Sequence, residues 1–148
     1  MGADLYVEDV FQPQHQAWSK KFDRALQQFH HTVDATDKDR LNQEVDHCYF
    51  QMYAAGYFRD SYNDYCLLWQ YGLSWWNDII PLLDAQNYLT PANAEVFSHL
   101  LQERRGTFEQ NLAALTQKLQ TYFRERSATL NAFLAEAARK SHAIKCSL

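Results

Sequence analysis

Four polar residues have the types and the spacing that could hold a metal ion. Glu44 and His47 have the Glu-x-x-His spacing that puts both side chains on one helix face in di-iron and di-manganese bundles. His30 and Asp34 lie one helical turn apart on an earlier segment. Such centres also need a second Glu-x-x-His pair and two further glutamates, and the sequence contains no second pair. We therefore expect no dedicated metal site and no cofactor.

Nucleophilic catalysis has weaker support still. The sequence contains no G-x-S-x-G turn, phosphate-binding loop, dinucleotide fingerprint or paired zinc motif. His47 and Cys48 are neighbours and point in different directions on a helix. The other cysteines, Cys66 and Cys146, add no C-x-x-C spacing, so neither a zinc ribbon nor a disulfide framework is expected. We predict a protein that is not an enzyme.

Aromatic side chains are concentrated in the segment 49–76, which contains three of the four tryptophans. Aromatic residues bury large areas, and Tyr and Trp keep a polar group, so they dominate both cores and binding surfaces. Trp, Tyr and Arg are also the usual anchors of protein interfaces. We predict a non-enzymatic protein-interaction module that uses this segment to bind a partner protein or a second copy. The alternative is a metal- or small-ligand-binding helical bundle.

Part of this segment forms the predicted interaction patch. In that interpretation Arg59 is a rim charge beside aromatic rings. In the structural alternative Asp60 caps a helix, while Arg59 stacks on Tyr57 or a tryptophan and pairs with a carboxylate. The residues of the predicted patch are Tyr57, Phe58, Arg59, Asp60, Tyr62 and Trp76.

The two adjacent tryptophans receive different predictions. Trp75 lies four residues from both Tyr71 and Ile79 and continues an apolar helical stripe, so we expect it in the core. Trp76 is turned about 100° from its neighbour around a helix axis and should lie nearer the edge.

The elements that must position these residues all have helical patterns. Apolar residues recur every three or four positions, and a first helix is predicted after Pro13. A second should end at Gly56 in a left-handed conformation, another should start at Thr90–Pro91, and a break is expected near Gly106. No segment alternates convincingly with period two. We predict an all-α fold, a single-domain bundle of four to five helices over residues 1–148.

Composition excludes several classes of protein. A mean hydropathy of -0.52 and the short apolar runs argue against a membrane span, which needs about 20 apolar residues. The start, MGADLYVEDVF, has acids where a signal peptide needs basic and apolar residues, so we expect a cytoplasmic location. Residues 118–148 hold six Lys and Arg against two Asp and Glu. Because these charges are diluted along a helical pattern, we interpret them as packing on an acidic body and consider nucleic-acid binding unlikely.

Four blocks of the chain resemble a group of small uncharacterised bacterial proteins. They are the start MGADLY, the block Gly56–Asn63, the block Gly72–Trp76 and the end Cys146–Leu148. The likeness spans the chain, and the two central blocks are its more specific parts. It implies one bacterial domain and carries no activity or functional residue across.

Overall fold

The structure is a computed structural model that describes residues 2–148. The chain divides into two compact units. The sheet unit comprises Met1–Val7 and Phe58–Leu148, and the hairpin unit comprises Glu8–Tyr57. A compact unit is not by itself an independently folding domain, so the single domain expected over residues 1–148 stays a prediction.

A four-stranded sheet in the order β2-β1-β4-β3 contradicts the predicted all-α fold. β4 runs antiparallel to β1 and to β3, with Leu5 opposite Cys146 and Leu89 opposite Ile144. The strands are β1 (Gly2–Tyr6), β2 (Tyr57–Ser61), β3 (Tyr88–Leu89) and β4 (Ile144–Ser147). The protein is mixed α/β, and its description as an all-α helical bundle is wrong.

The strands are hard to detect because they are short and far apart in sequence. β1 does alternate, with Ala3 and Leu5 buried between half-buried neighbours, but five residues give only two inward positions. In β2 the inward positions are Phe58 and Asp60. A carboxylate at an inward position hides the period-two pattern that marks a strand.

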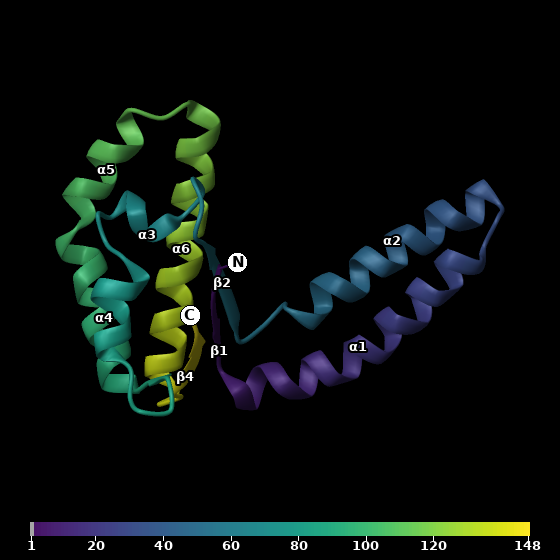
Figure 1. The fold of residues 1–148 in the computed structure, drawn as a ribbon, viewed down its shortest axis with the longest axis horizontal. Coiled ribbons are helices and arrows are strands. Elements are labelled where there is room, and N and C mark those ends of the chain that lie inside the picture. Colours follow the sequence, from purple (N-terminus) through teal and green to yellow (C-terminus); the bar gives the residue numbers. More distant parts are fainter. Residues whose placement is uncertain (1) are drawn as a thin grey trace. The chain divides into compact units, whose positions relative to one another are not determined.

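Helices of the sheet unit follow several of the predicted start and stop signals. Thr90 caps α4 by accepting a hydrogen bond from the backbone N–H of Asn93 at 3.2 Å, as predicted. The break expected near Gly106 lies slightly earlier, because α4 ends at Glu103 and α5 begins at Arg105. α4 packs along α6 (Figure 1). The helices are α3 (Leu67–Gln70), α4 (Pro91–Glu103), α5 (Arg105–Ala113) and α6 (Gln117–Arg139), with a π-helical turn at Trp75–Ile79 and a 3-10 turn at Ile80–Leu82.

The hairpin unit consists of α1 (Glu8–His31) and α2 (Ala35–Met52), which pack against each other (Figure 1). α1 begins five residues before Pro13 instead of after it, so the proline lies inside the helix. Asp34 caps α2 by accepting a hydrogen bond from the N–H of Asp37 at 2.9 Å.

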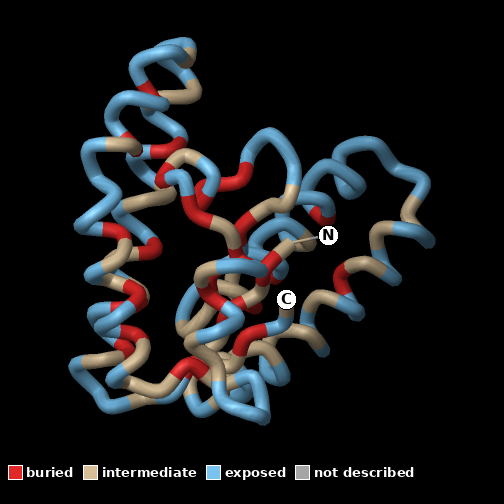
Figure 2. Tube along the Cα trace, turned by 60° about the vertical axis from the view of Figure 1, so that its left-hand side comes forward, coloured by how far each residue is buried: buried red, intermediate tan, exposed pale blue. Residues whose placement is uncertain are grey.

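Aromatic rings line the seam between the two helices. Trp18 contacts His47 edge to face at 5.5 Å, and Phe22 contacts Tyr49 at 6.2 Å between centroids. Figure 2 shows few buried positions along this unit. The buried side chains of residues 8–57 are Ala25, Leu41, Cys48 and Met52.

Gly56 has the positive φ predicted for it, at 65°. α2 nevertheless ends at Met52, with Tyr53 at its cap, so Gly56 shapes the turn into β2 and does not end the helix. A Cβ atom at Gly56 would lie 2.9 Å from the Cβ of Val10.

Within residues 2–148, no helix combines the length and the apolar character that a membrane crossing requires.

Candidate functional site: an aromatic platform around a buried aspartate

The centre of the candidate site is the carboxylate of Asp60, which is only 2% exposed. Its position on the inward face of β2 places it beneath the segment that follows the strand. The donors to Oδ1 are the backbone N–H groups of Ser61 (2.9 Å) and Leu67 (2.8 Å). The donors to Oδ2 are the N–H of Leu68 (3.2 Å), the indole Nε1–H of Trp75 (2.8 Å) and the thiol of Cys66 (3.4 Å).

These hydrogen bonds join the two central blocks of the sequence, Gly56–Asn63 and Gly72–Trp76. Hydrogen bonds to an ionised acceptor contribute about 1.5–3 kcal/mol each, and a buried network polarises its own members. Five hydrogen bonds therefore link residues 61–75 to the two buried carboxylate oxygens of Asp60. We call residues 58–76 the pinned segment.

The thiol of Cys66 serves this network as a donor. Burial, followed by the negative charge of Asp60, raises the pKa of Cys66 to about 12. Burial also raises the pKa of Cys146 to about 12. Because the thiolate is the reactive form of cysteine, both side chains remain protonated and unreactive near neutral pH.

Several large aromatic side chains of the pinned segment are exposed above this buried network. Trp69 is 51% exposed and Trp76 is 55% exposed. Tyr62 contacts Trp76, and Tyr65 contacts Tyr122 of α6 edge to face, each at 5.9 Å between centroids. These two ring pairs, Tyr62–Trp76 and Tyr65–Tyr122, together with the exposed Trp69, are called the aromatic platform.

A cavity of about 440 Å³ adjoins the platform at the outer edge of β2, between Ser61 and Tyr122. Its two cations are Arg59 and Arg126. The Arg126 guanidinium lies 4.4 Å from the ring centroid of Phe58 and donates a hydrogen bond to the backbone oxygen of Arg59. This hydrogen bond occupies one backbone acceptor of β2, which is an edge strand of the sheet.

The structure separates the six residues of the predicted patch. Phe58 and Asp60 are buried and cannot touch a partner, whereas Arg59 and Trp76 are exposed. Tyr62 is half-buried, and Tyr57 belongs to the hairpin unit. The expected exposure of Trp76 is therefore confirmed, as is the burial of Trp75 at 1%.

The structure agrees with the structural alternative in two respects, the capping role of Asp60 and the pairing of Arg59 with a carboxylate, whereas the stacking of Arg59 on Tyr57 or a tryptophan stays a prediction. Asp60 accepts hydrogen bonds from the first two N–H groups of α3, which start at Leu67. Arg59 lies 3.7 Å from the carboxylate of Asp4, in the neighbouring strand β1.

Sequence reasoning left three members of the platform out of the patch. Tyr65 lies in the turn before α3 and Trp69 lies within α3, so no single helical spacing in the sequence identifies them as one exposed face. Tyr122 lies on α6, and nothing in its local sequence connects it with Tyr65.

The residues of the alternative metal site have other contacts. Glu44 lies 3.7 Å from the guanidinium of Arg40. The structure brings no group of three or more His, Cys, Asp or Glu side chains into metal-binding proximity anywhere in residues 2–148. The four candidates Glu44, His47, His30 and Asp34 are therefore not gathered into one ligand set.

Comparison with protein-family models, with curated proteins and with solved structures finds no match to this chain. The resemblance of the sequence blocks to bacterial proteins stays a prediction.

Proposed function

We propose that this chain is a non-enzymatic protein-interaction module that self-associates through the aromatic platform of its sheet unit. The observation that carries the proposal is the exposure of Trp69 and Trp76, each more than half accessible, on the pinned segment. Large exposed aromatic groups mark contact sites, and Trp and Tyr are enriched among residues that dominate binding energy. The cytoplasm is the proposed location, which agrees with three free cysteines.

The hydrogen bonds to Asp60 favour association because they fix the pinned segment before a partner binds. Ordering a mobile loop on binding costs free energy, and a preorganised loop avoids most of that cost. The donors from Leu67, Leu68 and Trp75 hold the backbone next to Trp69 and Trp76 before any partner arrives. The platform therefore resembles a preformed binding surface more than an adaptable loop.

Charge supports a second copy as the occupant. The sheet unit carries nine Lys and Arg against ten Asp and Glu, so two such units repel each other little. A twofold-symmetric interface places the same patch on both sides, so a charged patch is self-complementary only if it holds both signs. Arg59 and Arg126 supply positive charge beside the platform, and the exposed Asp64 and Glu125 supply negative charge next to Tyr65 and on the turn after Tyr122.

Sedimentation velocity over a wide concentration range tests this proposal. We expect a monomer–dimer equilibrium in the unchanged chain and a dimer weakened about tenfold or more in Trp69→Ala and Trp76→Ala. Phe50→Ala is the matched control, because Phe50 is 70% exposed but lies in the hairpin unit. Circular dichroism of each variant verifies that the fold is retained.

Two results would overturn the proposal. One is an unchanged chain that sediments as a monomer at every concentration. The other is a dimer that dissociates in Phe50→Ala and persists in both tryptophan variants, which would place the interface on the hairpin unit.

A further inference from the structure

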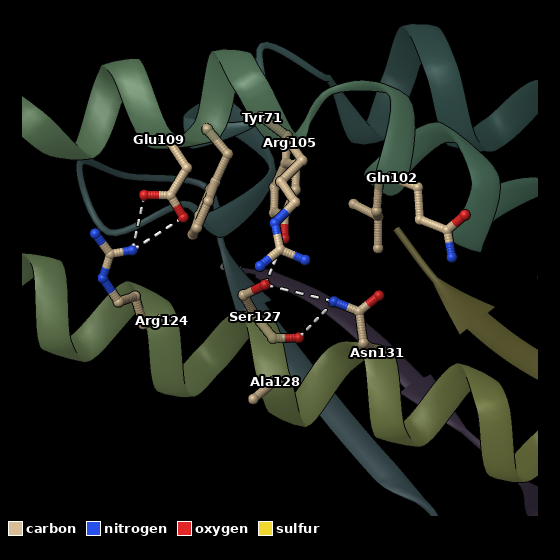
Figure 3. Close-up of a pocket in the computed structure, with 10 residues that line it drawn as sticks. Tyr71, Gln102, Arg105, Glu109, Arg124, Ser127, Ala128 and Asn131 are labelled. Atoms are coloured by element: carbon tan, nitrogen blue, oxygen red, sulfur yellow. Dashed lines mark hydrogen bonds and ion pairs between the residues drawn. The ribbon is translucent and has the colours of Figure 1, made fainter.

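A second cavity, of about 350 Å³, lies within the sheet unit between α4, α5 and α6 (Figure 3). Its volume is at the lower end of the roughly 300–1,000 Å³ of small-molecule sites. It shares no lining residue with the aromatic platform. Its principal polar lining residues are Tyr71, Arg105, Glu109, Arg124, Ser127 and Asn131.

Most of these polar groups are already paired with one another. Arg124 donates from Nη1 to both carboxylate oxygens of Glu109, at 3.0 and 2.9 Å. The Tyr71 hydroxyl hydrogen-bonds the Ser127 hydroxyl, and Asn131 Nδ2 donates to the backbone oxygen of Ser127 at 2.8 Å. The wall formed by α6 is therefore held in place before a ligand binds.

Arg105 is the exception. Figure 3 shows its guanidinium directed into the cavity, above Ser127 and between Glu109 and Asn131. Arg105 is an exposed residue, and within residues 2–148 its guanidinium forms no hydrogen bond and no close ion pair, although its charge contributes, after the hydrogen bond from Arg124, to the lowered pKa of the Glu109 carboxyl. The lining holds two arginines, Arg105 and Arg124, and one carboxylate, Glu109, which interacts with both, so its net charge is positive by one.

Apolar side chains also line the cavity. The ring of Tyr71 stacks on Phe108, with centroids 4.3 Å apart and an angle of 20° between the planes. Leu101 and Phe108 are buried beneath the cavity, and Ala128 leaves room on the α6 side.

We propose that this cavity binds a small organic monocarboxylate that carries one ring. The carboxylate lies against the Arg105 guanidinium, whose planar fork matches two oxygens. The ring packs beside the Tyr71–Phe108 stack, and the side-chain amides of Gln102 and Asn131 accept or donate hydrogen bonds to a polar substituent. A single negative charge balances the lining, and the volume suits one ring rather than a nucleotide.

The test uses benzoate as the probe and follows the full-length chain by ¹H–¹⁵N NMR. Benzamide is the neutral control of the same shape, and inorganic phosphate is the anion without a ring. We expect benzoate to shift the side-chain amide signals of Gln102 and Asn131 in a saturable way. We expect benzamide to bind about tenfold more weakly or worse, since it lacks the charge-assisted hydrogen bonds to Arg105.

Two variants and one matched control test whether benzoate binds in this cavity and whether Arg105 holds it. Arg105→Gln removes the charge and should abolish the benzoate shifts, whereas Arg104→Gln changes the neighbouring arginine, which does not line the cavity. Ala128→Leu fills the cavity without altering charge and should also abolish binding.

The proposal is overturned if benzoate causes no saturable shifts in the unchanged chain. It is equally overturned if the shifts persist in Arg105→Gln, or if benzamide or phosphate produces the same response as benzoate. Neither variant touches the aromatic platform, so this test and the sedimentation test can fail separately.

Discussion

The pinned segment and the hairpin unit are both rich in aromatic residues, but they are held together differently. In the pinned segment, one buried carboxylate receives five hydrogen bonds while Trp75 and Phe58 are almost completely buried around it. In the hairpin unit, partly exposed rings contact one another along a seam, as Trp18 and His47 do. The first region depends on one polar group, and the second distributes its stability over many modest contacts.

This difference has an energetic consequence. Removing one partner of a buried charge network leaves the remaining groups without hydrogen bonds, and that cost exceeds the net value of any single bond. Aromatic pairs contribute only about 0.5–1.5 kcal/mol beyond their buried area. Single substitutions should therefore be severe in the pinned segment and graded in the hairpin unit.

The largest expected effect is that of Asp60→Ala. The substitution leaves buried donors at Leu67, Leu68 and Trp75 unpaired, and we expect a loss of about 3–5 kcal/mol in the free energy of unfolding. Chemical denaturation measures it. Asp64→Ala is the control, because Asp64 is exposed and should change stability by less than about 0.5 kcal/mol. Similar stabilities for the two variants would remove the distinction between the two regions.

Trp75→Phe isolates one hydrogen bond of the same network. Phenylalanine keeps an aromatic ring in the core but lacks the indole N–H that donates to Asp60, so we expect a loss of about 1.5–3 kcal/mol. Trp76→Phe serves as the matched control, since Trp76 is exposed and should cost less than about 1 kcal/mol. Thermal unfolding of both variants provides the comparison, and equal losses would show that packing, not the hydrogen bond, determines the role of Trp75.

The features of the fold that could be predicted from the sequence are those with local signals. Helical periodicity requires many residues with one repeating pattern, and the hairpin unit provides them in Leu41, Val45, Cys48 and Met52. The Thr90–Pro91 start is a local signal and was predicted correctly. These features depend on neighbours in the chain.

The sheet and the platform depend on contacts between distant segments. β1 and β4 are far apart in the sequence. Apart from a short alternation of buried and half-buried residues, neither segment contains a signal that predicts their pairing. Asp60 was considered as a helix cap and as part of a binding patch, but its hydrogen bond to Trp75 depends on how the intervening segment folds back. Arg105, Ser127 and Asn131 come together from two helices by tertiary packing alone.

Glycine substitutions separate backbone strain from helix propensity. Gly56 has φ of 65°, and a Cβ there would lie 2.9 Å from Val10, so Gly56→Ala should destabilise the protein by about 1–2 kcal/mol. Gly106 lies in α5 with open space around its Cα, so Gly106→Ala should stabilise by about 0.4–1 kcal/mol. Differential scanning calorimetry should show shifts of opposite sign. A stabilising Gly56→Ala would contradict the left-handed turn between α2 and β2.

A small effect should also come from the contact between Trp18 and His47 in the hairpin unit. Their rings meet edge to face at 5.5 Å, and the Lys21 ammonium lies 3.9 Å from the Trp18 centroid, so several weak interactions overlap at this position. A double-mutant cycle with Trp18→Leu and His47→Leu should give a coupling free energy of about 0.5–1.5 kcal/mol. A coupling as large as the Asp60→Ala loss would mean that the hairpin unit also depends on a single contact, and the contrast between the two regions would then be wrong.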